Sequence, residues 1–93
     1  MSQYYFIVSS RAEKAIQSAY EWYEEQHNGL GENFIESLDN AFIAIRSNPM
    51  LYSFRKKTVR GCLTKGFPYL ILFEVSSSQI KVLNIFHTSQ KRV

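Results

Sequence analysis

The residues best suited to chemistry lie in the second half of the chain, where a histidine stands among cations. The C-terminal stretch IFHTSQKRV, residues 85–93, places His87 at the end of an apolar run, with Lys91 and Arg92 shortly after it. An imidazole titrates near neutral pH and can act as a general acid or base. The alternative is that His87 only ends a strand and bonds a backbone group.

Cleavage of RNA without a metal needs a base for the 2′-hydroxyl, an acid for the leaving oxygen and cations that stabilise the phosphorane. The candidate catalytic residues are therefore His87, with Arg60 and Lys57 on the phosphate. His27 and His87 are far apart in sequence, and neither belongs to a cluster with the spacing of metal ligands. We expect neither a metal nor another cofactor.

A second group of cations lies among aromatic residues in the stretch YSFRKKTVR, residues 52–60. Such a mixture suits nucleic acid, because cations meet phosphates and rings stack on bases. An exposed edge strand can also carry lysines simply to discourage aggregation. The candidate residues for binding a target or a nucleic acid are Arg55, Lys56, Lys57, Arg60, Lys91 and Arg92.

The charge is divided unevenly along the chain. The net charge is +3, but residues 51–93 hold eight of the eleven Lys/Arg residues and only one of the eight Asp/Glu residues, Glu74. Such asymmetry indicates an acidic partner or a nucleic acid, although it also fits a solvated basic face.

The length and composition favour a small intracellular protein. The 93 residues predict a single domain over residues 1–93. The single cysteine, Cys62, forms no disulfide within the chain and is expected to fill core space. No run is long and apolar enough for a secretory signal or a membrane span, so we expect a cytoplasmic protein.

The first half of the chain predicts a strand followed by two helices. Residues 4–8, YYFIV, have strand composition. A helix is expected to begin at Ser10, which forms a capping box with Glu13, and to end at Asn28 and Gly29. Apolar residues at helical spacing predict a second helix over 30–45, which ends before Pro49. The short connection predicts an antiparallel helical hairpin.

The second half predicts three strands joined by short turns. These are residues 54–63, the apolar run 67–75 and residues 80–87, with a turn at 76–79. The fold class is therefore α+β in the order β-α-α-β-β-β. We expect the helical hairpin to pack on one face of a mainly antiparallel four-stranded sheet.

The order of elements and several local patterns resemble the RelE/ParE superfamily, the toxins of bacterial type II toxin–antitoxin systems, also called plasmid stabilization proteins. The resemblance covers nearly the whole chain, including SSRAEKAIQSAYEWYEEQHNGLGENF, NPMLY, VRGCLTKGFPYLILFEV and IKVLNIFHTSQK. Its most specific part is the combination of Arg60, the step Phe67-Pro68-Tyr69 and the stretch Phe86-His87-Thr88-Ser89.

The resemblance implies a cytoplasmic toxin that a cognate antitoxin neutralises by wrapping it with an extended or helical tail. The ParE-like branch poisons DNA gyrase, and the RelE-like branch cleaves mRNA on the ribosome. Two stretches of the chain are more similar to the ParE-like branch, namely GFPYLILFEV and FHTS. Gln90, which joins the candidate target-binding residues, stands where many ParE-side sequences have an arginine, and the proline that follows it there is absent.

Two alternatives stay open beside gyrase inhibition. One is a ribosome-dependent endoribonuclease, although the RelE-like branch usually carries arginine and tyrosine near the C-terminus and this chain has no tyrosine after Tyr69. The other is a non-toxic module that only binds an antitoxin.

Overall fold

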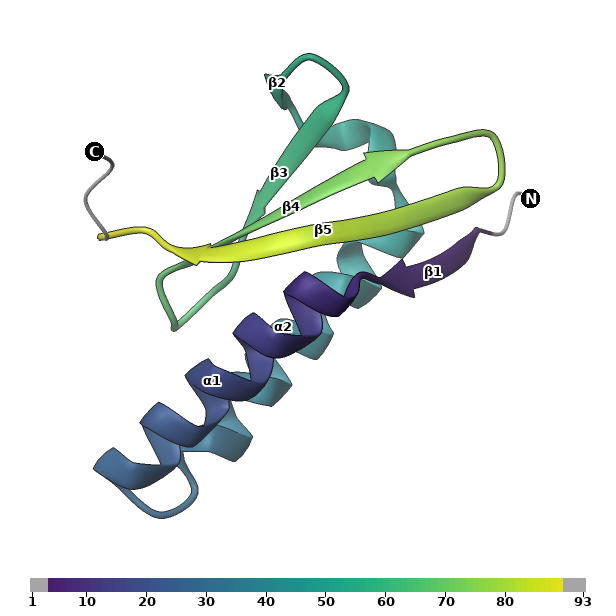
Figure 1. Cartoon of the computed structure of the whole chain (residues 1–93). Coiled ribbons are helices and arrows are strands. Elements are labelled where there is room, and N and C mark those ends of the chain that lie inside the picture. The colour runs from purple at the N-terminus through teal and green to yellow at the C-terminus, as the bar shows by residue number, and fades with distance from the viewer. Residues whose placement is uncertain (1–3, 90–93) are drawn as a thin grey trace.

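The computed structural model describes residues 4–89 and consists of a helical layer beneath a sheet (Figure 1). The elements in chain order are β1 (Tyr5–Val8), α1 (Ser10–Gln26), α2 (Leu30–Ser47), the 3₁₀ turn η1 (Pro49–Leu51), β2 (Phe54–Lys56), β3 (Val59–Leu63), β4 (Tyr69–Val75) and β5 (Gln79–His87). The α+β class and the helical pair are as the sequence predicts. Neither described helix has both the length and the apolar character that crossing a membrane demands.

The sheet has five strands, in the order β1-β5-β4-β3-β2, so the expected number of four is wrong. β1 pairs parallel to β5, and the other neighbours are antiparallel. The predicted strand 54–63 is in fact two strands, because the chain reverses at Lys57 and Thr58. Lys57 has a positive φ of 51°, a left-handed conformation that suits a tight turn.

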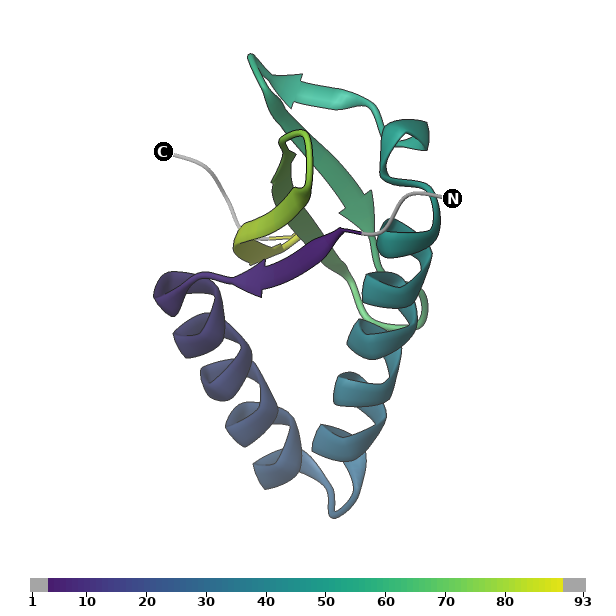
Figure 2. The ribbon, with the colours of Figure 1, turned by 90° about the vertical axis from the view of Figure 1, so that its right-hand side faces the viewer.

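The two helices converge at their connection and separate towards the sheet (Figure 2). α1 is capped by Ser9 and not by the expected Ser10. Ser9 Oγ accepts a hydrogen bond from the Ala12 N–H at 3.1 Å and donates one to the Leu83 carbonyl at 2.8 Å. The cap therefore also fixes the start of α1 to β5.

The start of α2 is capped from the preceding helix. Gly29 has a φ of 88°, which glycine tolerates without strain. The carboxylate of Glu24 in α1 accepts the N–H groups of Gly29 and Gly31 at 3.0 and 2.9 Å. A Cβ on Gly31 would lie 2.8 Å from the Tyr20 ring, so the absence of a side chain lets the helices approach closely.

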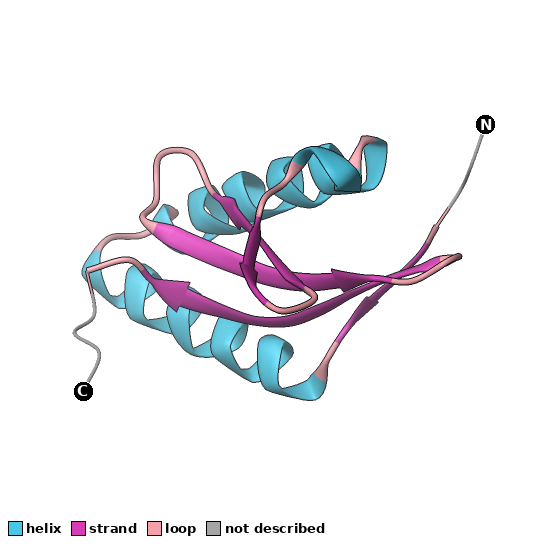
Figure 3. Cartoon of the chain, turned by 90° about the horizontal axis from the view of Figure 1, so that it is seen from above, coloured by secondary structure: helices cyan, strands magenta, loops and turns pink. Residues whose placement is uncertain are grey.

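The core lies between the helices and one face of the sheet. Figure 3 shows the same two layers from above. An aromatic group joins them, because the Phe34 ring of α2 contacts the rings of Tyr23, Phe67 and Tyr69. The buried apolar side chains are Ala12, Ala19, Tyr23, Phe34, Leu38, Ala41, Ile45, Cys62, Ile71, Phe73, Ile80, Val82 and Ile85. Cys62 thus fills core space as expected.

The helices cover one sheet face, as predicted, and the opposite face is less covered. Along β4 the buried Ile71 and Phe73 alternate with Leu70 and Leu72, which are only partly buried. Because side chains alternate between faces along a strand, Leu70 and Leu72 belong to the open face. The face of the sheet opposite the helices is therefore partly accessible to solvent.

Candidate functional site

His87 lies at the end of β5 on the face that carries the core. It is opposite Tyr69 in the sheet, and the two rings meet edge to face with centroids 5.2 Å apart. The Ser89 N–H donates to His87 Nδ1 at 3.2 Å, and the Ser89 Oγ lies 2.7 Å from the same nitrogen. A neutral ring in this geometry carries its proton on Nε2. The imidazole is half-buried and stabilises the turn that follows the strand.

Tyr69 is the aromatic neighbour of His87. The pKa of Tyr69 is raised to about 12, mainly because its phenol is buried and to a smaller extent because the phenol of Tyr23 lies nearby. The phenol therefore stays protonated at neutral pH. It contributes a ring surface beside His87 and no negative charge.

Arg60 is fixed by three contacts near the other end of the sheet. Its Nη1 donates to the Tyr52 carbonyl at 2.7 Å, and its Nη2 lies 3.3 Å from Met50 Sδ. Its guanidinium lies 4.0 Å from the centroid of the Phe54 ring, a cation–π contact. These contacts connect η1, β2 and β3, so Arg60 has a structural role whatever else it binds.

The exposed cations Arg55, Lys56 and Lys57, which we call the basic strip, follow β2 into the turn after it. Arg55 lies over Gly61: a Cβ there would be 2.7 Å from Arg55 Nε and 2.8 Å from its Cγ. Gly61 therefore leaves room for a close approach, as its position in a strand suggests. The exposed ammonium groups of Lys56 and Lys57 can meet an acidic ligand.

The three candidate catalytic residues do not converge. His87 is paired with Tyr69, whereas Arg60 is paired with Phe73, four residues further along β4. At about 3.3 Å per residue this separates them by about 13 Å along the strand direction. The buried Ile71 lies between these two positions, and Lys57 lies in the turn beyond Arg60. One phosphate cannot meet all three side chains in this arrangement.

The remaining candidates, Gln90, Lys91 and Arg92, lie outside the described residues. Within residues 4–89 no group of three or more His, Cys, Asp or Glu side chains is placed to hold a metal ion. Burial raises the pKa of the Cys62 thiol, which makes it a poor nucleophile.

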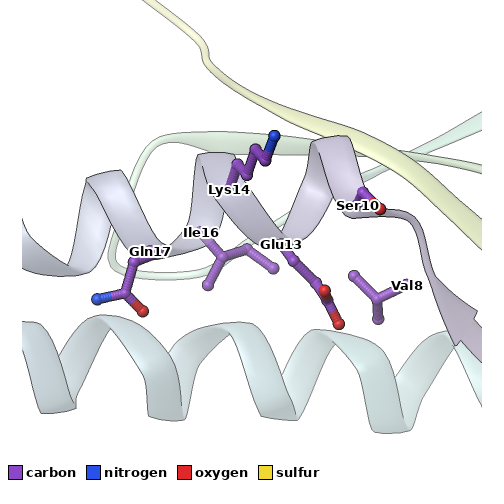
Figure 4. A pocket seen from close by; sticks show the side chains of 6 residues that line it. All are labelled: Val8, Ser10, Glu13, Lys14, Ile16 and Gln17. Atoms are coloured by element: carbon purple, nitrogen blue, oxygen red, sulfur yellow. The ribbon is translucent and has the colours of Figure 1, made fainter.

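A shallow hollow runs along the first turns of α1, away from the candidates above. It encloses about 620 Å³ and is lined by Val8, Ser10, Glu13, Lys14, Ile16 and Gln17. Figure 4 shows Glu13, Ile16 and Gln17 pointing to one side of the helix and Lys14 to the other. The hollow combines one carboxylate, one ammonium group, one hydroxyl, one amide and aliphatic surface, and this set does not point to a reaction.

The contacts around Arg60 and His87 include residues to which the sequence analysis gave no role in holding these two side chains. Met50 and Tyr52 hold the guanidinium, and Ser89 holds the imidazole. Ser89 is two residues from His87, the spacing of a local side-chain turn, and this signal was available in the sequence. The contact with Met50 depends on how η1 folds back, which no local pattern reveals.

Comparison with known proteins gives a family and a fold. The sequence profile described as "ParE toxin of type II toxin-antitoxin system, parDE" matches residues 6–92. A solved structure titled "Chromosomal ParDE TA system from P. aeruginosa" has a similar fold, with a TM-score of 0.82 at 12% identity, covering 94% of this chain and 98% of the other. Comparison with curated protein sequences gives no significant match.

Proposed function

Because the chain belongs to the ParE toxin family of type II toxin–antitoxin systems, we propose that it arrests growth by binding and inhibiting DNA gyrase in the cytoplasm. It is a toxin of this class, and a cognate antitoxin neutralises it by binding. Inhibition proceeds without a bond-breaking step of the toxin's own.

The observation that carries this proposal is the separation of the candidate catalytic residues. A nuclease needs its acid, its base and its phosphate-binding cations within reach of one phosphodiester. Here His87 and Arg60 are about 13 Å apart along the strand direction, and Arg60 is already held by the Tyr52 carbonyl. A surface that binds without cleaving fits this arrangement better than an assembled active site does.

The basic strip supports a partner that is acidic or contains nucleic acid. Arg55, Lys56 and Lys57 are all exposed on one edge of the sheet. Gyrase bound to DNA offers phosphates, and an antitoxin with an acidic tail offers carboxylates. Both partners would therefore compete for this edge.

The RelE-like alternative rests on His87. Its ring is half-buried and not enclosed, and the bonds of Ser89 to Nδ1 leave the Nε2 side for a substrate. In this alternative the histidine moves a proton during mRNA cleavage on the ribosome, and the cations that complete the site come from elsewhere.

Induced expression combined with a gyrase assay tests the proposed function. We expect growth arrest with filamentous cells and intact mRNA, and inhibition of DNA supercoiling when the purified protein is added to gyrase. Arrest with cleaved mRNA and unaffected supercoiling would support the ribonuclease instead. Normal growth, with binding to the antitoxin retained, would identify a non-toxic binding module.

The variant His87→Asn distinguishes a structural role of His87, through its hydrogen bond with Ser89, from a role in proton transfer. The Asn Oδ1 can accept the Ser89 N–H in place of Nδ1, but an amide does not act as a general acid or base at neutral pH. We expect inhibition of supercoiling within about threefold of the wild type, because loss of proton transfer would cost about 10²–10⁴-fold. Growth assays of wild type and variant at equal expression provide the second measurement. A loss of that size, with unchanged thermal unfolding, would mean that His87 is catalytic.

A further inference from the structure

The two edge strands of the sheet differ in charge. β2 carries the exposed cations Arg55 and Lys56, and charged side chains on an edge strand discourage pairing with another chain. β1 forms the opposite edge, and its sequence YFIV has no charged side chain. The first charged side chain of the sequence belongs to Arg11, beyond the end of β1. β1 is therefore an edge strand without this protection.

The backbone groups of Phe6 and Val8 point to this free edge. The N–H groups of Tyr5 and Ser9 donate to carbonyls in or next to β5 at 2.9 and 3.0 Å. Because alternate residues of a strand direct their backbone groups to opposite sides, Phe6 and Val8 turn their N–H and C=O groups away from β5. Within residues 4–89 none accepts these two N–H groups. The free edge thus offers donors and acceptors to a further strand.

The side chains of β1 alternate between the two faces of the sheet. Phe6 and Val8 pack against the core on the helical face, whereas Tyr5 and Ile7 are 76% and 41% exposed on the opposite face. Figure 2 shows β1 spanning the space between the separated ends of the two helices. The edge therefore combines unpaired backbone groups with exposed apolar surface.

A second copy of β1 can pair antiparallel to the first about a two-fold axis at Ile7. Phe6 of one copy then lies opposite Val8 of the other, and each of these pairs exchanges both of its N–H···O bonds. The two Ile7 residues meet at the axis as a pair without hydrogen bonds, in which Cα atoms approach to about 4.5 Å. The contact is closed, because both copies use the same residues.

The same pairing brings opposite charges together on the helical face. The Arg46 guanidinium lies 5.6 Å from the centroid of the Phe6 ring, and Glu13 lies beside Val8 in the hollow at the start of α1 (Figure 4). Since Phe6 lies opposite Val8 of the second copy, Arg46 of each copy meets Glu13 of the other. Both side chains are exposed, and neither forms an ion pair within residues 4–89.

The exposed cation next to β1 on the opposite face does not prevent this arrangement. Lys81 is opposite Ile7 in β5. The two Lys81 residues of a dimer would be three strand spacings apart, about 14 Å. This separation exceeds the screening length of about 8 Å at physiological ionic strength, so their repulsion is small.

We propose that the free toxin forms a weak symmetric dimer through β1, in which the two five-stranded sheets join into one. A second copy fits this edge because the strand is uncharged and complementary to itself, and because the contact of Arg46 with Glu13 occurs twice. A nucleic acid or a strongly acidic chain would meet no opposite charge on β1 itself. The contact rests on a four-residue strand, so we expect Kd in the micromolar range.

Sedimentation equilibrium of the purified full-length chain over the micromolar range tests the dimer. Ile7→Glu places a carboxylate beside Lys81, which favours the folded monomer, but brings two carboxylates together at the dimer axis. Leu63→Glu is the matched control, because Leu63 is exposed on the same face at β3, away from β1. We expect the dimer Kd to rise by about 100-fold for Ile7→Glu and to stay within about threefold for Leu63→Glu.

A charge exchange tests the antiparallel register. Glu13→Arg and Arg46→Glu are each expected to weaken the dimer by about fivefold at low salt, because each places like charges opposite one another. The double variant Glu13→Arg,Arg46→Glu is expected to restore the wild-type Kd. Thermal unfolding of dilute samples, in which the chain is monomeric, shows whether a change lies in the fold instead. Failure of the double variant to recover affinity would overturn this register.

Amide exchange provides a readout without mutation. We expect the Phe6 and Val8 amides to exchange about tenfold more slowly in concentrated than in dilute samples, while the Ser9 amide, already bonded within the chain, does not change. A chain that stays monomeric at every concentration, or exchange at Phe6 and Val8 that does not depend on concentration, would overturn the proposal. A dimer that Leu63→Glu dissociates and Ile7→Glu does not would assign the contact to the opposite edge of the sheet.

Discussion

Replacing Phe34 with alanine is expected to lower the free energy of unfolding by about 3–5 kcal/mol. Phe34 is fully buried, and its ring centroid lies 5.1 Å from Tyr69, 5.4 Å from Tyr23 and 5.7 Å from Phe67. These rings come from α1, from β4 and from the loop before β4. The substitution leaves a cavity where the helical layer meets the sheet, and the surrounding backbone cannot close it without separating these elements.

The size of the chain makes this loss severe. Domains of this kind have a total stability of about 5–15 kcal/mol, so one side chain would remove a large share. Urea unfolding followed by circular dichroism measures the effect. Phe54→Ala is the control, because Phe54 is 57% exposed and its ring packs against the guanidinium of Arg60 at the sheet edge. We expect the control to lose about 1 kcal/mol or less, and equal losses in both variants would contradict this account of the core.

The helical part of the fold could be predicted because its signal is periodic. The apolar spacing of the second helix selects six residues, of which four are buried and two, Leu30 and Phe42, are partly buried against the core. The buried four are Phe34, Leu38, Ala41 and Ile45. One face of a helix repeats over several turns, so an error at one position does not shift the others. The helix ends were also predictable, since Gly29 and Pro49 break the pattern where the structure does.

The strand boundaries were harder to predict, and Lys57 explains why. A residue with a left-handed backbone conformation is usually glycine or asparagine, and these residue types allow a turn to be predicted from the sequence. Here a lysine adopts a φ of 51° between two cation-containing strands, so the pattern of residues 54–63 predicts one strand. Because this turn reverses the chain, it also decides which side chains share a face. The contact of Phe54 with Arg60 follows from the reversal and could not be inferred before it.

At the candidate site, too, a contact between residues close in sequence could be predicted, whereas a contact between residues far apart in sequence could not. The partner of His87 at Ser89 is local, whereas its ring contact with Tyr69 depends on the pairing of β4 with β5. A bulge between Leu72 and Phe73 shifts this pairing by one residue. Such a shift moves side chains to the opposite face, and sequence alternation alone does not locate it. Composition therefore suggested candidate residue types, but it could not show how their side chains lie relative to one another.

Reversing the charge of Lys56 and Lys57 together, with Lys56,Lys57→Glu, is expected to weaken gyrase inhibition by on the order of 10- to 100-fold. Both side chains are exposed at the edge of the sheet, whereas Arg55 packs over Gly61 and is left unchanged. Each phosphate that the protein no longer neutralises removes about 0.9 from the slope of log affinity against log salt concentration. We therefore expect the slope for binding of the gyrase–DNA complex to fall by about 2.

The matched control is Arg11,Lys14→Glu, which makes the same change in net charge on the exposed first turns of α1. Glutamate is also favourable near a helix N-terminus, so the control should keep its stability. If only the total charge attracts the target, both double variants will lose inhibition equally and the basic strip is not the binding surface. If the strip itself contacts phosphate, the control will keep both its inhibition and its salt slope. Its position at the sheet edge then accounts for target binding without any catalytic step.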